Sequence, residues 1–514
     1  MTLTSITSSR SSDGYDLADI DFDGAAMITP RTTNTNLDAV SQEFRLASNN
    51  NEKVNWLVGA YYYQEDLAYD ADVIWGPMWR PLMDIFTAQQ TGGLASLAGV
   101  GAIFNVPSSQ ILQAGTGSIV SGTQDTETTT FFAQVDINLT DKLSAILGAS
   151  YIEDDKKATL SELNTDVFSQ LDFVGAGTLQ YIQAGFPPAT AAALAGDPAT
   201  NPLLLFQGLQ FLNQLVAIPN AAESGQSLDD NVDYTAKLTY LINDNVSIYG
   251  GVATGFKSSA WNLTGNSLPS TSEIAALAAA GTPVPPNTSP GQRYARPESA
   301  EVFELGMKMR LPSGYLNITA FKQEIEDFQS NVFVSSGFIL ANAGLQSSEG
   351  FEFDLLLSPV PSIDITFGGL VMDSNYDSFV GADTSSGADM SGTKPENVHD
   401  KSFTSAITYN WSQGQTEGYV RLNHLYSGPT WIRLDPADND VMCAAGFCQK
   451  TKDTLNFSAG ITMGNLDIIL YGNNINDDEY LTSTFPEVGD PLASSFNGYP
   501  NAPKTYGITF NYSF

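Results

Sequence analysis

Apolar and polar residues alternate with a period of two along several short segments of this chain. Mostly apolar residues occupy every second position of Phe131–Leu139, Leu143–Tyr151, Phe403–Trp411 and Leu455–Met463, with polar or small residues between them. Successive side chains of a β-strand point to opposite faces. The pattern therefore predicts strands that have one apolar and one polar face.

The end of the chain shows the same alternation most clearly. One face of the last nine residues carries Tyr506, Ile508, Phe510, Tyr512 and Phe514, and the other carries Gly, Thr, Asn and Ser. The sequence stops on the aromatic Phe514, so no later residue could cover an open sheet edge. We therefore expect this strand to be paired within a closed structure.

Short turns and long connections alternate between the expected strands. Seven segments with turn chemistry lie at 49–51, 140–141, 243–245, 312–314, 359–361, 412–414 and 464–465. The eight longer connections lie at about 23–40, 67–125, 159–227, 261–296, 331–342, 379–397, 431–449 and 481–502. This scheme gives about sixteen strands, an even count that places both chain ends on one side and makes pairing of the first strand with the last topologically possible. We expect the two longest connections to contain short helices that fold over the mouth or into the lumen.

Composition agrees with a membrane barrel. Only 15% of the residues are charged, whereas there are 21 Tyr and 28 Phe, a balance that suits strands. No run approaches eighteen apolar residues, and the mean hydropathy is -0.10, as expected where only alternate residues meet lipid. The predicted fold is an all-β, transmembrane, antiparallel up-and-down barrel with long extracellular loops. The net charge of -35 excludes nucleic acid as a partner.

The start of the chain carries no export signal. Met1 is followed by Thr-Leu-Thr-Ser-Ile-Thr, without a basic region, an apolar core or a cleavage site. Since an outer-membrane protein must cross the inner membrane, we expect the chain to be a mature segment or a truncated reading frame.

Two cysteines stand close together, and little else favours a metal. Cys443 and Cys448 are five residues apart, which in an oxidising compartment favours a disulfide loop. The two histidines, His399 and His424, have no ligand-like neighbours, so a zinc site is not expected. Four oxygen-rich residues at 435 and 438–440 lack the spacing of a calcium loop, and solvated turns are the default interpretation. No metal or cofactor is predicted.

Three residues of the first long connection could contact a ligand. Trp75, Trp79 and Arg80 could form an external platform, because aromatic faces and guanidinium groups bind planar or anionic cargo. Aromatic residues also gather at membrane interfaces as girdles, which is the structural alternative.

Two further residues are expected inside the barrel. Arg421 and Asn423 alternate with Val420 and Leu422, so they should face the lumen and could line a solute path. Polar lumenal residues occur in any barrel, so this signal is unspecific. No catalytic constellation is present, since histidine is nearly absent and no nucleophile elbow stands between a strand and a helix. We do not expect an enzyme.

Several segments, taken in order, resemble the barrel of TonB-dependent receptors, the active transporters of the Gram-negative outer membrane. The matching stretches are Tyr249–Asn262 (YGGVATGFKSSAWN), Arg296–Lys308 (RPESAEVFELGMK), Leu316–Phe328, Asn342–Asp354 (NAGLQSSEGFEFD) and Asn473–Tyr480 (NNINDDEY). The terminal aromatic strand is similar to the signature that the barrel-assembly machinery reads. The resemblance covers most of residues 1–514 and is weakest in the long loops.

The chain departs from the family pattern in one large respect. Family members carry an N-terminal plug inside a barrel of about twenty-two strands, and neither the plug nor its energy-coupling box is visible here. The segment Thr2–Arg10 resembles a mid-barrel strand, so the chain should begin about six strands into the parent barrel. The resemblance implies contact with the TonB energy-coupling protein only through the missing plug of the parent.

Three functions are compatible with these observations. The first is the barrel of a receptor for a scarce large solute, such as a ferric siderophore, cobalamin, an oligosaccharide or an aromatic compound. The second is a passive pore of general-porin width. The third is a surface or adhesion protein whose loops bind partners. In each case outer-membrane lipid and lipopolysaccharide would surround the barrel, and the solute cannot be read from the sequence.

Overall fold

A computed structural model describes residues 1–22, 24–49, 53–93, 95–212, 214–286, 288, 290–334, 337–383, 388–432, 442–486 and 496–514. Its main element is one sheet of sixteen antiparallel strands, each hydrogen-bonded to its neighbour in the sheet order. The strands are β1 (Thr2–Ala18), β2 (Arg31–Ala47), β3 (Val54–Ile74), β4 (Gly117–Asn138), β5 (Leu143–Asn164), β6 (Gln226–Asn243), β7 (Val246–Lys257), β10 (Glu298–Leu311), β11 (Gly314–Val334), β12 (Gly337–Val360), β13 (Ile363–Ser378), β16 (Lys401–Gln413), β17 (Thr416–Trp431), β18 (Gln449–Met463), β19 (Leu466–Asn473) and β22 (Thr505–Tyr512).

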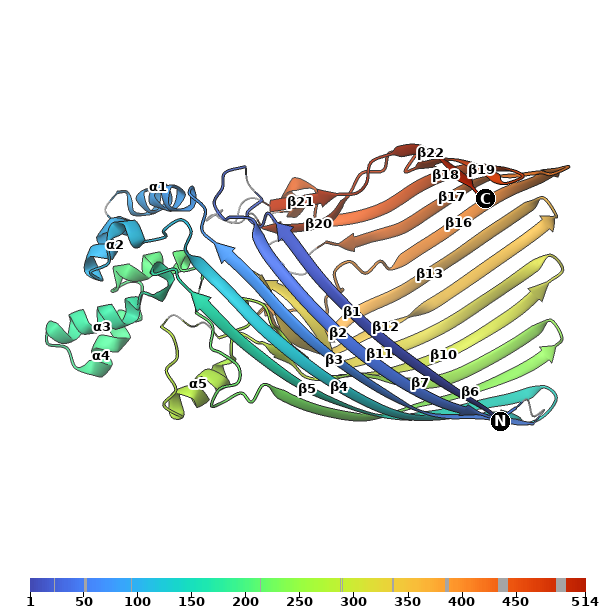
Figure 1. The fold of residues 1–514 in the computed structure, drawn as a ribbon, viewed down its shortest axis with the longest axis horizontal. Helices are drawn as coiled ribbons and strands as arrows, with labels where there is room; N and C mark the ends of the chain where they lie inside the picture. The colour runs from blue at the N-terminus through green and yellow to red at the C-terminus, as the bar shows by residue number, and fades with distance from the viewer. Residues whose placement is uncertain are drawn as a thin grey trace.

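The sheet is strongly curved and encloses an interior space. Figure 1 shows short turns at one end of the strands and long connections with helices at the other, and the two chain ends lie at the short-turn end. We call these the short-turn end and the loop end. The predicted count of about sixteen strands and the up-and-down order are confirmed. All seven predicted turns fall between consecutive strands, although residues 50 and 51 of the first lie outside the described part.

The two faces of the sheet differ as the alternation predicts. Phe131, Leu147 and Ile407 of the apolar series are 56%, 49% and 48% exposed. The opposite face of the same strands looks inward, because loop residues that fold across the opening contact it. Ile218, for example, exchanges backbone hydrogen bonds with Leu160, and Leu215 packs with Leu160 in a buried cluster. The apolar series therefore covers the outside of the curved sheet.

Four predicted connections were drawn too long. Residues 67–74 of β3 continue to pair with 117–124 of β4, and β2 already begins at Arg31. The strands β5 and β6 likewise extend to Asn164 and from Gln226, and β11 and β12 continue to Val334 and from Gly337. Several residues of these extensions are buried at the loop end, Ala71, Val120 and Leu160 among them. Leu215 and Ile218 of a long connection pack there on Val120 and Leu160, so the simple alternation is lost although the hydrogen-bonded ladder continues.

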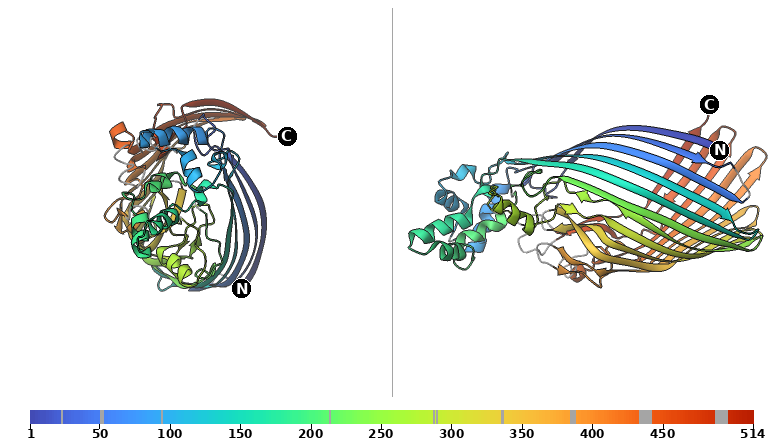
Figure 2. Two further views of the ribbon diagram at one scale, coloured as in Figure 1. Left: turned by 90° about the vertical axis from the view of Figure 1, so that its left-hand side faces the viewer. Right: turned by 90° about the horizontal axis from the view of Figure 1, so that it is seen from below.

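The sheet has two edges in the described residues. The strand β1 pairs only with β2, and β22 pairs only with β19. The end-on view in Figure 2 shows a curved wall whose first and last strands stand apart. The closure of the first strand on the last, which the even count allows, is therefore not seen between these two strands.

Helices gather at the loop end and across its opening, as the left panel of Figure 2 shows. They are α1 (Trp79–Thr91), α2 (Leu97–Ile103), α3 (Phe173–Gln183), α4 (Pro188–Ala195) and α5 (Thr271–Ala279), with short 3-10 turns at Ser108–Gln110, Phe168–Gln170 and Pro202–Leu209. The prediction of short helices in the two longest connections is confirmed. In the described ranges, none of these helices has both the length and the apolar character that a membrane span requires.

Three small two-stranded sheets complete the loop end. The strands β8 (Ala260–Trp261) and β9 (Tyr294–Ala295) close the base of the connection that carries α5. The hairpin of β20 (Leu481–Pro486) and β21 (Phe496–Pro500) stands in the last long connection. The strands β14 (Val380–Asp383) and β15 (Ala388–Asp389) pair beyond the end of β13.

The segment Asn473–Tyr480 lies along the part of β18 that extends beyond the end of its neighbour β19. The side chain of Asn476 accepts a hydrogen bond from the backbone N–H of Leu455 at 2.8 Å and donates to the carbonyl of Asp453. The carboxylate of Asp478 accepts from the backbone N–H of Asp453 at 2.7 Å. These side chains replace the missing ladder partner, because unpaired backbone groups at a sheet edge are costly. The side chains of Asn476 and Asp478 thus cap the edge of β18.

Candidate solute-binding site at the lumen and its mouth

The inner wall of the sheet is polar and partly aromatic. Arg421 and Asn423 are half-buried, whereas their neighbours Val420 and Leu422 are exposed on the outside, 38% and 39% respectively. The guanidinium of Arg421 donates to the hydroxyl of Thr408 at 2.9 Å, and the amide of Asn456 donates to Asn423 at 3.0 Å. Both residues therefore lie in the polar inner wall.

A hollow of about 850 Å³ lies along this wall near the short-turn end. Its polar lining comes from Asn410, Glu417, Tyr419, Thr462 and Asp467 of neighbouring strands. Glu417, Thr462 and Asp467 stand in one row across three strands, since Thr462 pairs with both of the others. The lower wall thus presents two carboxylates and several hydroxyl and amide groups to the interior.

The loop end carries a group of folded connections with an apolar core of its own. Buried residues of three connections form it: Met27 and Ile28 before β2, Trp75, Trp79, Met83, Leu97, Val100, Ile111 and Leu112 between β3 and β4, and Phe168, Leu171, Phe173, Leu203, Phe206 and Leu209 between β5 and β6. We call this assembly the loop cap. A core of this size lets three connections fold as one body, because each alone would leave its apolar side chains exposed.

Trp75 and Trp79 belong to this core and do not form an external platform. Each indole is 1% exposed, and the two rings stack with centroids 4.5 Å apart and an interplanar angle of 5°. Trp79 also meets the edge of Phe211 at 5.3 Å. The prediction of a ligand platform does not fit this burial, and neither does the alternative of a membrane girdle. Both interpretations assumed exposed rings, since the sequence did not show that another connection covers them.

Arg80 is likewise occupied within the loop cap. Its guanidinium donates to Asp84 at 2.9 Å and to the carbonyls of Ser108 and Ile111, both at 2.8 Å. These contacts fasten the first turn of α1 to the segment that follows α2. The guanidinium of Arg80 is thus engaged within the loop cap.

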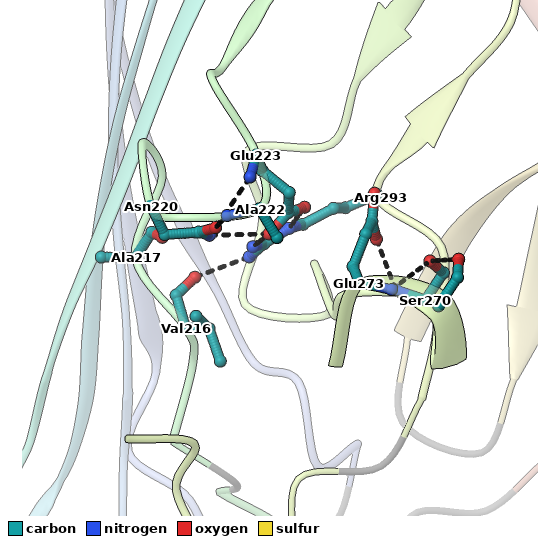
Figure 3. Close-up of polar contacts among 9 residues, drawn as sticks. Val216, Ala217, Asn220, Ala222, Glu223, Ser270, Glu273 and Arg293 are labelled. Carbon is teal, nitrogen blue, oxygen red and sulfur yellow. Dashed lines mark hydrogen bonds and ion pairs between the residues drawn. The ribbon is translucent and has the colours of Figure 1, made fainter. Parts of the chain in front are cut away.

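A buried ion pair joins the end of the connection between β5 and β6 to the connection between β7 and β10. Arg293, just before β9, donates to the Glu223 carboxylate through Nε at 2.6 Å and contacts it again through Nη2. Its Nη1 donates to the carbonyl of Val216 at 2.6 Å. The two side chains are only 1% and 3% exposed. Figure 3 shows the guanidinium pointing into the segment of Val216, Asn220 and Glu223, away from α5.

Sequence reasoning missed this pair. Arg293 lies in a polar stretch without periodicity, and Glu223 is one of 57 acidic residues, so neither stands out. The only available signal was the scarcity of cations, 22 Lys and Arg in 514 residues, which makes each Arg in a long connection worth examining.

The family-like motif residues Arg296 and Asn342 fix the base of β10. The Asn342 side chain accepts from the backbone N–H of Arg296 at 2.8 Å and donates to the carbonyls of Arg296 and Asp327. Arg296 also pairs with Asp327 at 2.5 Å. Asp327 has a φ of 52° and interrupts the ladder between Glu326 and Phe328, although the register of β11 with β12 is the same on both sides of it. The motif thus sets where β10 leaves the sheet.

The pKa values of two ionisable groups at the loop end are shifted from their ordinary values. Burial raises the pKa of Asp166, which is 0% exposed and accepts hydrogen bonds from Ser169 and Phe168. Burial also lowers the pKa of His399, and the ammonium groups of Lys452 and Lys450 lower it further. The Nδ1 atom of His399 hydrogen-bonds to the carbonyl of Gly428. The neutral imidazole is therefore the form that suits this site.

The remaining candidate residues lie at the two ends of the barrel. A disulfide joins Cys443 and Cys448 in the connection between β17 and β18. In β22, Tyr506, Ile508, Phe510 and Tyr512 are 67%, 55%, 63% and 59% exposed on the outer face, and Phe514 follows the strand fully exposed. Positions 435 and 438–440, considered for calcium, lie outside the described residues. Within the described ranges no cluster of three metal-ligating side chains occurs.

Several solved structures share this architecture. The chain superposes on the ferric yersiniabactin uptake receptor FyuA from Yersinia pestis with a TM-score of 0.63 and 16% identity, over 100% of this chain and 58% of that one. The siderophore receptor PiuA from Acinetobacter baumannii gives 0.57 and 15%, over 99% and 61%. The copper transporter OprC gives 0.58 and 8%, over 100% and 62%. These likenesses show the fold.

The fold is thus that of an outer-membrane receptor barrel. The family profile described as TonB dependent receptor-like, beta-barrel, matches residues 3–475. The chain belongs to this family, and its place is the Gram-negative outer membrane. It spans roughly three fifths of the length of the solved relatives, 58% to 62% in the cases above. No curated protein matches the sequence.

Proposed function

We propose that this chain is the barrel of a receptor that takes up a scarce large solute with energy supplied through the TonB protein. The observation that carries the proposal is the family match over residues 3–475, together with a polar lumen beneath a folded loop cap. Membership implies an outer-membrane transporter of scarce solutes, not an enzyme. Contact with TonB would be made by a plug in the whole receptor, and both termini of this chain would then lie on the periplasmic side.

A ferric siderophore is the first solute class to test. Two of the structural neighbours are described as a ferric yersiniabactin uptake receptor and a siderophore receptor, and a third as a copper transporter. The identity to these neighbours is 8% to 16%, so their described solutes are used here to choose the first compounds for an uptake test. Cobalamin, oligosaccharides and aromatic compounds belong to the same panel.

The proposed solute path runs along the inner wall past Arg421 and Asn423. Both lie in the polar wall between β16 and β18, and the guanidinium of Arg421 is held in place by Thr408. A guanidinium on the inner wall can attract an anionic chelate. Replacing Arg421 by Ala in the whole receptor should raise the concentration for half-maximal uptake of an anionic chelate and leave that of a neutral sugar unchanged.

The decisive experiment is growth and uptake by a deletion strain on a panel of iron chelates, cobalamin and glycans, with the whole gene restoring it. Uptake that depends on TonB supports the proposal. TonB-independent diffusion of many solutes, together with large steady currents in planar bilayers, would identify a passive pore instead. Absence of both uptake and current would indicate a surface-binding barrel.

A further inference from the structure

Two lysines and one tyrosine meet on the inner face of β6, β7 and β10, which are neighbours in the sheet. Leu238 of β6 is 54% exposed on the outer face, so its neighbour Lys237 points inward. Leu305 of β10 is 66% exposed on the outer face, so Lys308 points inward as well. The ammonium groups of Lys237 and Lys308 lie 3.9 Å and 5.7 Å from the ring centroid of Tyr249 on β7. The inner wall thus carries two positive charges beside one aromatic ring.

The ring of Tyr249 is fixed against the wall. Its hydroxyl hydrogen-bonds to the hydroxyl of Thr319 on β11 at 2.9 Å, and Thr319 is only 7% exposed. A Cβ atom on Gly306 would meet the ring at 2.4 Å, so the ring lies directly on the backbone of β10. An ammonium group is attracted to the face of an aromatic ring. The position of the Lys237 ammonium therefore depends on a ring that is held by two neighbouring strands.

Neither ammonium group is neutralised by a carboxylate in direct contact. Acidic residues outnumber Lys and Arg by 57 to 22 in the chain, but among the residues that the structure describes no carboxylate lies within 4.0 Å of Lys237 or Lys308. The carboxylate in the register row of Lys308 is that of Asp354, and it accepts from the amide of Asn317 at 3.0 and 3.1 Å. A lysine ammonium has three N–H donors. Both groups can therefore donate to an acceptor in the lumen.

We propose that Lys237 and Lys308 form a subsite for an oxyanion, a carboxylate or phosphate group, of the solute that passes along the inner wall. Ammonium groups make strong, charge-assisted hydrogen bonds to such groups. The subsite lies in the short-turn half of the lumen, since β7 begins at Val246 directly after a short turn, and it is separate from Arg421 on β17. The inference rests on the proposed function and adds that the solute carries a negative charge.

The test is isothermal titration calorimetry of the whole chain in nanodiscs of uncharged lipid at low ionic strength, with citrate and inorganic phosphate as separate probes. Lys237→Met and Lys308→Met should each raise the dissociation constant about fivefold, as for a partly exposed ion pair, and the double variant should lose binding. Lys237→Arg and Lys308→Arg keep the charge and should restore binding. A response to citrate alone identifies a carboxylate as the bound group, and a response to phosphate alone identifies a phosphate.

Two control variants separate the subsite from the charge of the protein as a whole. Lys322→Met removes a lysine that pairs with Glu324 at 2.7 Å on the outer face of β11, and it should leave the affinity unchanged. Glu304→Gln removes a carboxylate in the register row of Lys237 and should tighten binding, because the anion is then repelled less. Equal affinity in the wild type and the double lysine variant, or binding of neither probe, would overturn the proposal.

Binding and transport are measured separately. If the two lysines bind a probe but the whole gene restores no uptake of an anionic solute, the proposed function is wrong and the subsite remains. If uptake depends on TonB but the affinity for both probes does not respond to the lysines, the subsite alone is wrong.

Discussion

Trp75 and Trp79 stack face to face, with ring centroids 4.5 Å apart, inside the loop cap. The first follows β3 directly and the second begins α1, so the stack fixes the direction in which the chain leaves the sheet. Both rings also contact a core drawn from two other connections. The path of the chain at the loop end thus depends on two side chains that are buried in the loop cap.

Trp79→Ala should unfold the loop cap while the barrel persists. Removal of a large buried aromatic side chain costs about 3–5 kcal/mol, more than a small cap can lose. Limited proteolysis should then cut within 75–116 and 165–212 in the variant and not in the wild type, and the strands should keep their heat resistance in gel shifts. Ile85→Ala, at a residue that is 58% exposed on the same helix, is the matched control. An uncut variant would show that the stack is dispensable.

Asn476→Ala should loosen the edge of β18 locally. The change leaves the backbone N–H of Leu455 and the carbonyl of Asp453 without their partner, at a cost of about 1–3 kcal/mol. Amide exchange at Leu455 should therefore rise well above that of the wild type. Asp477→Asn serves as the comparison, since it removes only an exposed ion pair with Lys504. Equal exchange in the two variants would contradict the role assigned to Asn476.

The His399 site should lose stability in mild acid. The pKa of His399 in the folded protein is lowered, mainly by burial and also by Lys452 and Lys450. The contribution of His399 to folding stability is therefore present above the ordinary pKa of about 6.5. It is lost as the pH falls through the lower pKa of the folded state. The apparent melting temperature should thus fall between pH 7.5 and 5 more in the wild type than in His399→Gln. Identical pH profiles would rule this group out as the origin.

Phe514→Ala should slow assembly without weakening the folded barrel. The residue lies beyond β22 and is fully exposed, so the folded state loses no packing with it. The resemblance to the terminal assembly signature predicts that less protein reaches the outer membrane. Pulse-chase assembly in cells and urea unfolding of the purified barrel separate the two effects. A normal assembly rate in the variant would contradict the hypothesis that Phe514 is part of an assembly signature.

The sequence predicted the strands best where lipid covers one face. Series such as Phe131–Leu139 alternate because one side meets hydrocarbon and the other a polar lumen, and the turns between them have recognisable residues. The same rule failed at residues 67–74 and 117–124, where loop residues pack on the paired strands, as Leu215 and Ile218 do on Val120. Sequence order therefore predicted the count of sixteen strands but not their full length.

The family motifs show a similar division. Their presence identified the class of barrel, yet the reason for them appeared only in the structure, where Asn342 holds the base of β10 and Asn476 closes the edge of β18. Such side chains substitute for backbone partners that are far away in sequence. Their role can be described only when the register of the neighbouring strand is known.

By itself the sequence determined the class, the alternation of faces and the positions of the turns, because these follow from residues that are close together along the chain. Only the tertiary structure decided the loop end. Burial of Trp75 and Trp79, the contacts of Arg80 and the Arg293–Glu223 ion pair all need residues that are distant in sequence, 70 positions apart in the case of the ion pair. No local pattern encodes which distant segment will cover an aromatic ring or neutralise a charge.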